Sequence, residues 1–573
     1  MPNRYRLAAA ACALLVVLFF HLAVAWQDFA TMSSNGFLYD DSFYAFKIAR
    51  SIAAGQGMTF DGVHPTTGFQ PLYVFLLVPA FMASGGDPVL PIYIALSILA
   101  LFTTLTTWLV YRIARRYAGF AASAAAAAIW TLSPVVIRQS ANGLETAVAA
   151  FMIALAACYY LENVRPLIEP GPARFAVLGI LLGLVVISRI DGIFLVMAVM
   201  LDYLFLMRKR RVTGTAVMKL LLLPLGVLLF YGPWLFYNLI ESGSPLQDSG
   251  AATRFLSLAY ASYFDYGPEN LAGSGPNASF IWGHVVHSVS VMKVIPAAHV
   301  VFRAIDKAGG MLGAGGAFHA AGNVLGFLAL LWVGLRVRGW RREPGKSNRS
   351  ELYFLLLFSG LLLAAYSLYI FGAFFFLRYY FPVYFAASIL SALLLQDLFD
   401  WYRKRHLFAR RALAAAGAAY LIVFAGFSWS QSFRTHPVYS YRDLAGWIDA
   451  NTREDETIGV FQCGTIGYLS NRRIVNLDGK VNRDAFEALK TGCLEEYLQS
   501  EKIDVVVDHA KILRIFLGIT PEKMKSSCTQ IVPEYMKPPS GWVAFRRSGE
   551  EIGNISGRAA LGRAAAILPP ASR

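Results

Sequence analysis

The sequence predicts an α-helical polytopic membrane protein with a small α/β domain near its C-terminus. The chain has 573 residues, of which 56% are hydrophobic and 15% are charged, whereas soluble proteins carry about 25% charged residues. Its apolar residues form runs close to the roughly 20 residues that cross a bilayer. Its basic residues gather in short loops between these runs, which is the orientation signal of membrane proteins. The net charge of +15 therefore indicates membrane topology rather than nucleic-acid binding.

The first apolar run, residues 7–26, follows Arg4 and Arg6 and resembles a signal peptide. No convincing small-x-small cleavage site follows it, and about 20 apolar residues is long for the hydrophobic region of a signal peptide. We interpret it as an uncleaved first span with the N-terminus in the cytoplasm. Residues 27–70 then lie outside.

A second apolar run, residues 71–86, is short and is interrupted by Pro79. We expect it to form a helix in the outer membrane interface rather than a crossing. The next basic cluster contains Arg112, Arg115 and Arg116 and predicts a cytoplasmic loop. A crossing at residues 71–86 would place every later basic loop on the wrong side of the membrane.

Alternation of basic and non-basic loops predicts about eleven spans, with the C-terminus outside and juxtamembrane helices in the first outer loop. Residues 280–302 are moderately apolar but contain three histidines and a lysine, which are costly inside a bilayer, so we assign them to the interface. The predicted spans are residues 7–26, 90–111, 120–138, 146–161, 175–188, 192–207, 220–239, 317–335, 352–371, 381–398 and 412–427.

The last quarter of the chain has a different pattern. Residues 457–470 and 502–510 contain the short apolar runs of buried strands, and residues 439–452 and 484–500 have the period of amphipathic helices. Strands that alternate with helices predict a small α/β domain. The expected organisation is a transmembrane domain over residues 1–430, an extracytoplasmic α/β domain over residues 431–548 and a disordered tail over residues 549–573.

The cysteines give little guidance about a disulfide framework. Cys12 and Cys158 lie in apolar runs, and Cys463, Cys493 and Cys528 lie in the C-terminal part. In an oxidising compartment one pair could form a disulfide, and we favour Cys493–Cys528. The odd number argues against a designed framework.

Two adjacent acids, Asp40 and Asp41, follow the first span and precede an amphipathic helical pattern. The pair is expected at a helix N-cap, where a carboxylate accepts backbone N–H bonds and complements the helix dipole. That role explains one acid, but a like-charged neighbour is costly. A doubled acid at the membrane rim therefore suits either a cation or a reaction in which one carboxylate takes a proton.

Further polar residues lie at the predicted outer ends of spans. Glu145 follows an Asn142-Gly143 turn and is either a plain helix-terminal acid or part of a site. Arg189 and Asp191 stand at the end of another span and, taken alone, are best interpreted as an interfacial ion pair.

Arg378 lies within a run of aromatic residues that includes Tyr379. An arginine at the rim can snorkel, or it can bind a phosphate bidentately at membrane depth. His64 lies in a turn-rich outer loop and could serve as a base, metal ligand or hydrogen-bond donor, although a lone loop histidine usually does none of these.

In the C-terminal domain, Asp478 and Lys480 could face the membrane site, but a strand-connecting loop is the favoured interpretation. The sequence has no phosphate-binding loop, no Rossmann glycine pattern and no metal-spaced set of Cys and His. Chemistry on the outer side would therefore use a lipid-borne activated donor.

Two stretches resemble the bacterial polyprenyl-phosphate-dependent glycosyltransferases of the GT-C superfamily. They are "DDSFYAFKIARSIAAGQGMTFDGVHPTTGFQPLY" (residues 40–73) and "NGLETAV" (residues 142–148). The superfamily places acids in the first outer loop, then juxtamembrane helices, then an acid in the second outer loop. The resemblance covers roughly residues 1–200, and "LRYYFP" and "GTIGYLSNRRIVNLDGKVN" resemble later features more loosely.

The resemblance implies an enzyme that transfers a sugar from a polyprenyl phosphate carrier to a glycan, lipid or protein acceptor, with inversion at the anomeric carbon. Asp40 or Asp41 would be the general base. Glu145, with His64, would support the acceptor or a metal, and Arg378, with Arg189 and Tyr379, would bind the donor phosphate. Some members use a divalent cation and others do not; Asp41 and Glu145 are the candidate ligands for Mg or Mn.

The resemblance also implies a multi-pass protein of the bacterial inner membrane with a periplasmic C-terminal domain. Two alternatives stay open. A transporter of a lipid-linked saccharide would need polar residues or broken helices at the membrane midplane, whereas the candidate charges here lie at the outer rim. A non-catalytic scaffold of envelope assembly would tolerate the loss of Asp40, Asp41 and Glu145.

Overall fold

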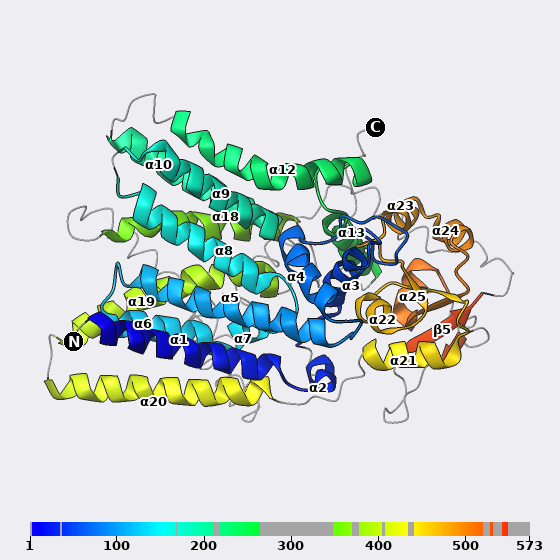
Figure 1. Cartoon of the computed structure of the whole chain (residues 1–573), viewed down its shortest axis with the longest axis horizontal. Coiled ribbons are helices and arrows are strands. Elements are labelled where there is room, and N and C mark those ends of the chain that lie inside the picture. Colours follow the sequence, from blue (N-terminus) through cyan, green and yellow to red (C-terminus); the bar gives the residue numbers. More distant parts are fainter. Residues whose placement is uncertain are drawn as a thin grey trace.

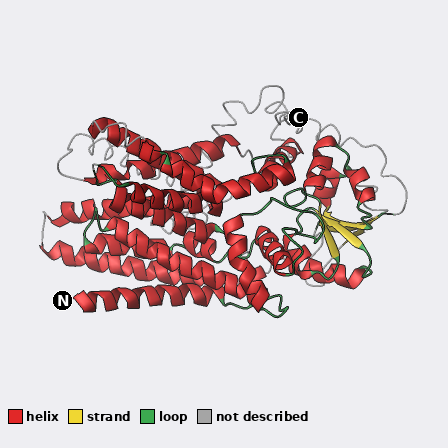
Figure 2. Cartoon of the chain, turned by 45° about the horizontal axis from the view of Figure 1, so that its top comes forward, coloured by secondary structure: helices red, strands yellow, loops and turns green. Residues whose placement is uncertain are grey.

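Parallel and antiparallel helices form a long bundle, and a small sheet domain covers one end of it (Figures 1 and 2). The computed structural model describes residues 3–34, 37–167, 169–210, 218–263, 348–369, 377–403, 407–433, 441–519, 528–530 and 541–547. The predicted span at 317–335, the interfacial stretch at 280–302 and the tail at 549–573 lie outside these residues.

Every predicted span inside the described ranges coincides with a helix or a bent helix pair. Among the described residues, seven helices are long and apolar enough to cross a membrane, or eight if α6 and α7, which meet at a 55° bend, form one span. The polytopic helical fold is therefore confirmed, whereas the number of about eleven stays a prediction. The bundle helices are α1 (Asn3–Ala25), α5 (Leu90–Ala114), α6 (Phe120–Leu132), α7 (Pro134–Ser140), α8 (Thr146–Tyr159), α9 (Pro172–Ser188), α10 (Ile193–Arg210), α12 (Leu222–Ser242), α18 (Tyr353–Tyr369), α19 (Phe381–Arg403) and α20 (Leu407–Ser432).

The basic loop residues meet at the end of the bundle that lies away from the sheet. Arg112 at the end of α5 pairs with Glu162 of the π-helical turn η1 (Tyr160–Val164), and Arg165 pairs with Asp202 near the end of α10. The N-terminus lies at this same end of the bundle (Figure 1). The alternation expected from the sequence thus places basic clusters at one end and the sheet domain at the other.

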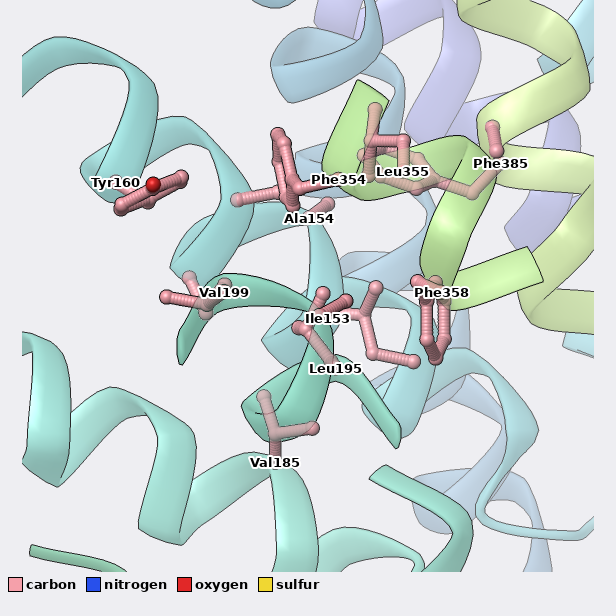
Figure 3. Close-up of a cluster of buried hydrophobic side chains, with 14 of the residues drawn as sticks. Ile153, Ala154, Tyr160, Val185, Leu195, Val199, Phe354, Leu355, Phe358 and Phe385 are labelled. Atoms are coloured by element: carbon pink, nitrogen blue, oxygen red, sulfur yellow. The ribbon is translucent and has the colours of Figure 1, made fainter. Parts of the chain in front are cut away.

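The bundle core is built from apolar side chains of α8, α9, α10, α18 and α19 (Figure 3). Ile153, Leu195 and Phe358 are almost completely buried within it. On another side, α9 and α12 approach closely through glycines, because a Cβ on Gly183 would lie 2.5 Å from the Gly226 carbonyl oxygen. Small residues are what let membrane helices pack backbone against backbone.

Four shorter helices lie between the bundle and the sheet domain (Figure 1). They are α2 (Phe29–Ser34), α3 (Asp40–Ala53), α4 (Pro71–Ala83) and α13 (Asp248–Tyr263). At about 1.5 Å per residue, the 13 residues of α4 extend only about 20 Å, short of the roughly 30 Å hydrocarbon core. Its length agrees with the expectation of a helix that does not cross.

The C-terminal domain has a five-stranded mixed sheet with strand order β2-β1-β3-β5-β4. β1 is parallel to β2 and to β3, whereas β5 is antiparallel to β3 and to β4. The strands are β1 (Thr457–Val460), β2 (Arg473–Asn476), β3 (Val505–His509), β4 (Cys528–Gln530) and β5 (Trp542–Arg546), and the helices are α21 (Tyr441–Asn451), α22 (Gly464–Leu469), α23 (Arg483–Thr491), α24 (Leu494–Ser500) and α25 (Ala510–Phe516).

Two details of this domain differ from the sequence-based expectations. Residues 457–470 were expected to form short buried strands, but only Thr457–Val460 is strand and Gly464–Leu469 is the helix α22. The apolar residues after β1 are buried by docking onto the membrane domain rather than by a sheet. Cys493 is exposed with a free thiol, so the favoured Cys493–Cys528 disulfide is not formed.

The two parts of the protein share one hydrophobic core, because α22 packs directly on α3. Tyr468 of α22 contacts the rings of Phe43 and Phe46 of α3, and its hydroxyl donates to the Pro88 carbonyl at 2.6 Å. The guanidinium carbon of Arg50 in α3 lies 4.4 Å from the centre of the Tyr468 ring, and the guanidinium group donates to the backbone carbonyl of Tyr468. These contacts fix the C-terminal domain along the length of α3.

Candidate active site

Both acids of the Asp40-Asp41 pair lie in the first turn of α3, but neither caps that helix. Tyr39 occupies the N-cap position and makes no side-chain cap bond. Asp40 instead points toward α22 and accepts backbone N–H bonds from Gly464 at 3.1 Å and Thr465 at 2.7 Å. Burial raises the pKa of Asp40 to about 6 despite these bonds. Asp40 thus joins the membrane domain to the C-terminal domain.

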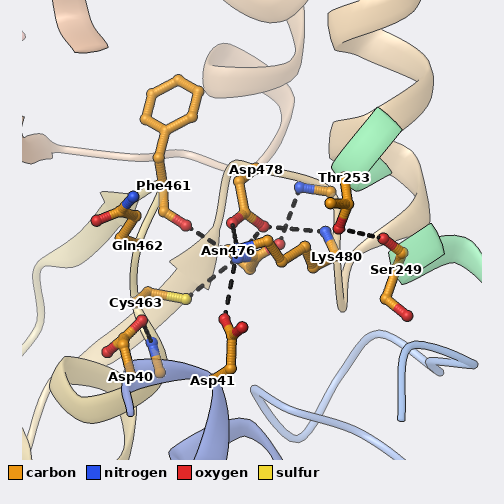
Figure 4. Close-up of polar contacts among 12 residues, drawn as sticks. Asp40, Asp41, Ser249, Thr253, Phe461, Gln462, Cys463, Asn476, Asp478 and Lys480 are labelled. Carbon is orange, nitrogen blue, oxygen red and sulfur yellow. Dashed lines mark hydrogen bonds and ion pairs between the residues drawn. The ribbon is translucent and has the colours of Figure 1, made fainter. Parts of the chain in front are cut away.

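Asp41 is held between two cations that come from distant parts of the chain. Its Oδ2 lies 2.6 Å from a guanidinium nitrogen of Arg378, in the short helix η4 (Leu377–Tyr380), and its Oδ1 lies 3.4 Å from Nζ of Lys480. Figure 4 shows Asp41 and Lys480 pointing toward one another. Burial alone would raise the pKa of Asp41, but the charges of Lys480 and Arg378 hold it well below its usual range.

Lys480 is positioned by the loop that follows β2. Its Nζ lies 3.1 Å from Asp478 Oδ2, and its backbone N–H donates to the other oxygen of Asp478. Asn476 also donates to Asp478 and connects this loop to Phe461 (Figure 4). Burial opposes the charge of Lys480, but Asp41 and Asp478 raise its pKa well above the usual value.

Asp41, Arg378 and Lys480 form part of the wall between two cavities. The larger cavity, of about 430 Å³, also contacts Glu145, Arg189 and apolar side chains of α10 and α18. The smaller cavity, of about 190 Å³, is lined by polar and aromatic groups of the C-terminal domain and by α13. A molecule in either cavity therefore meets the same three charged groups.

Glu145, Arg189 and Asp191 form a buried network beside the larger cavity. Arg189 pairs with Asp191 at 2.8 Å and with Glu145 at 3.1 Å, and Tyr366 donates to Asp191 at 2.7 Å. The interpretation of Arg189 and Asp191 as an ion pair agrees with this geometry. The centre of the Tyr379 ring lies 5.3 Å from the guanidinium carbon of Arg378 and 5.9 Å from that of Arg189, so the ring is close to both this network and the Asp41–Arg378 pair.

His64 is not brought to either cavity. Its Nδ1 lies 2.7 Å from Asp61 Oδ2, and its Nε2 lies 3.3 Å from Glu501 Oε1 in the C-terminal domain. The hydrogen bond to Asp61 raises the pKa of His64, and Glu501 adds to this effect. His64 therefore bridges the first outer loop and the C-terminal domain. It does not lie beside Glu145, with which it was predicted to support the acceptor or a metal.

The carboxylates expected to bind Mg or Mn are already neutralised by cationic side chains. Asp41 pairs with Arg378 and Lys480, and Glu145 pairs with Arg189. Within the described ranges, no three His, Cys, Asp or Glu side chains are grouped so that they could hold a metal ion. These side chains fit two internal ion-pair networks better than a divalent cation site.

Several cavity residues were not selected from the sequence. Lys480 was assigned to a connecting loop, whereas the structure turns it toward Asp41. Gln70 and Tyr73 line the larger cavity, and the Tyr73 hydroxyl donates to the Gly143 carbonyl. The available signal for Lys480 was its place in the turn-rich stretch 464–482, which resembles the superfamily only loosely.

Solved structures of similar architecture include ArnT and archaeal oligosaccharyltransferases. ArnT from Cupriavidus metallidurans, bound to undecaprenyl phosphate, is 13% identical with a TM-score of 0.51 over 95% of this chain and 98% of that chain. The oligosaccharyltransferase AglB from Archaeoglobus fulgidus, in complex with an inhibitory peptide and a dolichol phosphate, is 16% identical with a TM-score of 0.49 over 89% and 71%. An Archaeoglobus fulgidus oligosaccharyltransferase in complex with Zn and sulfate is 17% identical with a TM-score of 0.49 over 87% of this chain and 68% of that chain.

The protein is thus a polytopic membrane protein whose fold is similar to that of ArnT. Residues 70–237 match the family described as dolichyl-phosphate-mannose-protein mannosyltransferase. Residues 430–555 match a domain family of unknown function. No curated protein matches the sequence.

Proposed function

We propose that the protein transfers a sugar from a polyprenyl phosphate carrier to a glycan, lipid or protein acceptor of the cell envelope, with Asp41 as the general base. The observation that carries the proposal is the position of the Asp41 carboxylate, in the wall shared by two cavities and 2.6 Å from Arg378. The GT-C fold and the undecaprenyl phosphate bound to ArnT support the choice of donor.

Asp41 is a better candidate for the base than Asp40. Asp40 uses both carboxylate oxygens to accept backbone N–H bonds from α22, so it has a structural task. Asp41 lines both cavities, and its side chain is 24% exposed. A general base must reach the proton that it removes. Asp40 lines only the smaller cavity and has both oxygens engaged by α22, whereas Asp41 lines both cavities.

The proposed reaction is a single displacement. A hydroxyl of the acceptor gives its proton to Asp41 while its oxygen attacks the anomeric carbon from the face opposite the phosphate. The bond between that carbon and the phosphate oxygen breaks, and the polyprenyl phosphate leaves with the bonding electrons. The configuration at the anomeric carbon is inverted. Arg378 stabilises the negative charge on the departing phosphate, and Tyr379 stacks against its guanidinium group.

The remaining cavity residues have supporting roles in this proposal. Glu145 and Asp191 hold Arg189 in place, and Arg189 adds positive charge to the wall of the larger cavity. We also propose that residues 1–430 form the catalytic membrane domain, with the N-terminus in the cytoplasm of a bacterial cell. Residues 431–548 would form a periplasmic domain above the inner membrane, because the basic loops lie at the other end of the bundle.

The test is transfer by the purified protein in lipid, with a panel of radiolabelled polyprenyl-phosphate sugars as donors. Asp41→Asn should lower kcat by about 10²- to 10⁴-fold, the usual contribution of a positioned general base. Asp40→Asn is the matched control, since it changes the neighbouring carboxylate and keeps one of the two oxygens that accept N–H bonds from α22. It should keep kcat within about tenfold of the wild type.

Folding is checked by the apparent Tm of each variant. Full transfer by folded Asp41→Asn would refute its assignment as the base. Loss of transfer in Asp40→Asn, with Asp41→Asn unaffected, would move the base to Asp40. If the wild type neither transfers nor slowly hydrolyses any donor in the panel, the glycosyltransferase function itself is refuted.

A further inference from the structure

We propose that Lys480 of the C-terminal domain and Arg378 of η4 together bind the phosphate of the lipid-linked donor, and that both exchange Asp41 for this phosphate when the donor arrives. The inference rests on the proposed function and adds a coupling between donor binding and the base. Asp41 is then released from its two cations only while the donor is present.

The positions of the three groups support an exchange rather than a permanent ion-pair cluster. Arg378 and Lys480 each contact a different oxygen of Asp41, at 2.6 Å and 3.4 Å. All three side chains line both cavities. The larger cavity has mostly apolar walls, which suit a polyprenyl chain. A phosphate attached to that chain meets both cations at the point where they hold Asp41.

Lys480 can lose Asp41 and still stay in place. Its second carboxylate partner, Asp478, is 3.1 Å away with a side chain only 3% exposed, and Asp478 also accepts from Asn476 and from the Lys480 backbone. Gly479 between them has φ +77° and packs against Phe486. The loop is therefore held by contacts that do not involve Asp41, and the ammonium group stays at the cavity wall after the exchange.

The exchange would also change the basicity of Asp41. Two cations hold its pKa well below the usual range, and a carboxylate in that state is a weak base. A phosphate shared between the same cations removes attraction and adds a negative neighbour, so the pKa of Asp41 rises in the donor complex. The titratable or charged groups around Asp41 are Asp40 and Tyr44 of α3, Arg378 and Tyr379 of η4, Lys480 and Asp478 after β2, and Tyr441 of α21.

Binding of undecaprenyl phosphate to the full-length protein tests the exchange without the acceptor or the sugar being known. Lys480→Gln should weaken binding by about 10- to 100-fold, as expected for a lost charged hydrogen bond, and Lys480→Arg should restore most of it. Lys490→Gln is the matched control, because Lys490 pairs with Glu487 on α23 of the same domain. It should bind like the wild type.

Asp41→Asn gives the result that separates exchange from a merely structural role. Without the carboxylate, neither cation has to separate from Asp41 before it binds phosphate, so Asp41→Asn should bind undecaprenyl phosphate several-fold tighter than the wild type although it no longer supports transfer. Equal or weaker binding by folded Asp41→Asn would overturn the exchange. This variant also keeps the proposal testable if Lys480→Gln does not fold.

The pH dependence of transfer provides a second readout. In the wild type, the acid limb of kcat should lie at higher pH than that of kcat/KM, because kcat reports the donor complex and kcat/KM the free enzyme. Lys480→Gln removes one of the two cations that lower the pKa of Asp41 in the free enzyme. It should therefore move the acid limb of kcat/KM to higher pH and reduce the pH difference between the two limbs. Coincident limbs in the wild type would overturn the exchange alone. A wild-type protein that neither binds undecaprenyl phosphate nor transfers any sugar would overturn the proposed function as well.

Discussion

Gly68 is a position where one added methyl group should directly disturb the candidate active site. A Cβ at Gly68 would lie 1.8 Å from the carbonyl oxygen of Lys480 and 2.9 Å from its carbonyl carbon. Real Cβ contacts are essentially never shorter than 3.0 Å, so the Lys480 backbone would have to retreat by about 1.2 Å. Because misplacement of about 1 Å can cost about 10²-fold in rate, Gly68→Ala should lower kcat/KM for sugar transfer by about 100-fold.

The assay is the initial rate of transfer from a labelled polyprenyl-phosphate sugar, together with the apparent Tm. The matched control is Gly446→Ala in α21 of the same domain, where an added Cβ meets nothing within 4 Å; it should keep the wild-type rate. Gly68 does not have positive φ, so its substitution acts through this close contact rather than backbone strain. Wild-type kcat/KM in folded Gly68→Ala would refute the argument that the position of Lys480 matters.

Three further outcomes follow from the contacts. Asp40→Ala should lower the free energy of unfolding by about 1–3 kcal/mol, because two backbone N–H groups of α22 lose their acceptor; an apparent Tm equal to that of Asp40→Asn would contradict this. Because Asp61 and Glu501 raise the pKa of His64, the stability they supply should be complete below pH about 6.5 and lost as pH rises through the raised pKa. His64→Gln should remove this part of the pH dependence of Tm, and an unchanged pH profile would show that it arises elsewhere. Glu145→Gln, which keeps an oxygen for Arg189 but removes a charge, should reduce kcat by about tenfold or less, and a loss as large as that of a general base would assign Glu145 a direct role.

The membrane-domain fold was largely predictable because its signals are local. A run of about 20 apolar residues can satisfy its backbone inside a bilayer only as a helix, whatever its neighbours are. Each predicted span in the described ranges therefore coincides with a helix or a bent pair. The helix α22 was missed because residues 464–469 form a short apolar segment, and such segments do not reveal whether a sheet or another domain buries them.

The candidate site was predictable only in part. Asp41, Glu145 and Arg378 were predicted as site residues because charged side chains at a membrane rim are costly unless they are paired or functional. All three line the larger cavity. Lys480 lies in the sequence of a soluble domain, where a lysine is common. Its sequence neighbourhood therefore does not mark it as a site residue. The imidazole of His64 was suited to acid–base chemistry or metal binding, but Asp61 and Glu501 hold it away from both cavities.

The sequence by itself determined the membrane class, the places of the helices and the presence of acids at one rim, since these depend on residues close together in the chain. Only the tertiary structure decided that Asp40 binds α22 and reaches the smaller cavity alone, while Asp41 lines both cavities. Arg378 and Lys480 are 337 and 439 residues away from Asp41. Arg378 meets it from η4 beside the bundle helix α19, and Lys480 meets it because α22 docks on α3. The direction in which two neighbouring carboxylates point depends on this docking, and no local pattern encodes which distant surface covers a helix.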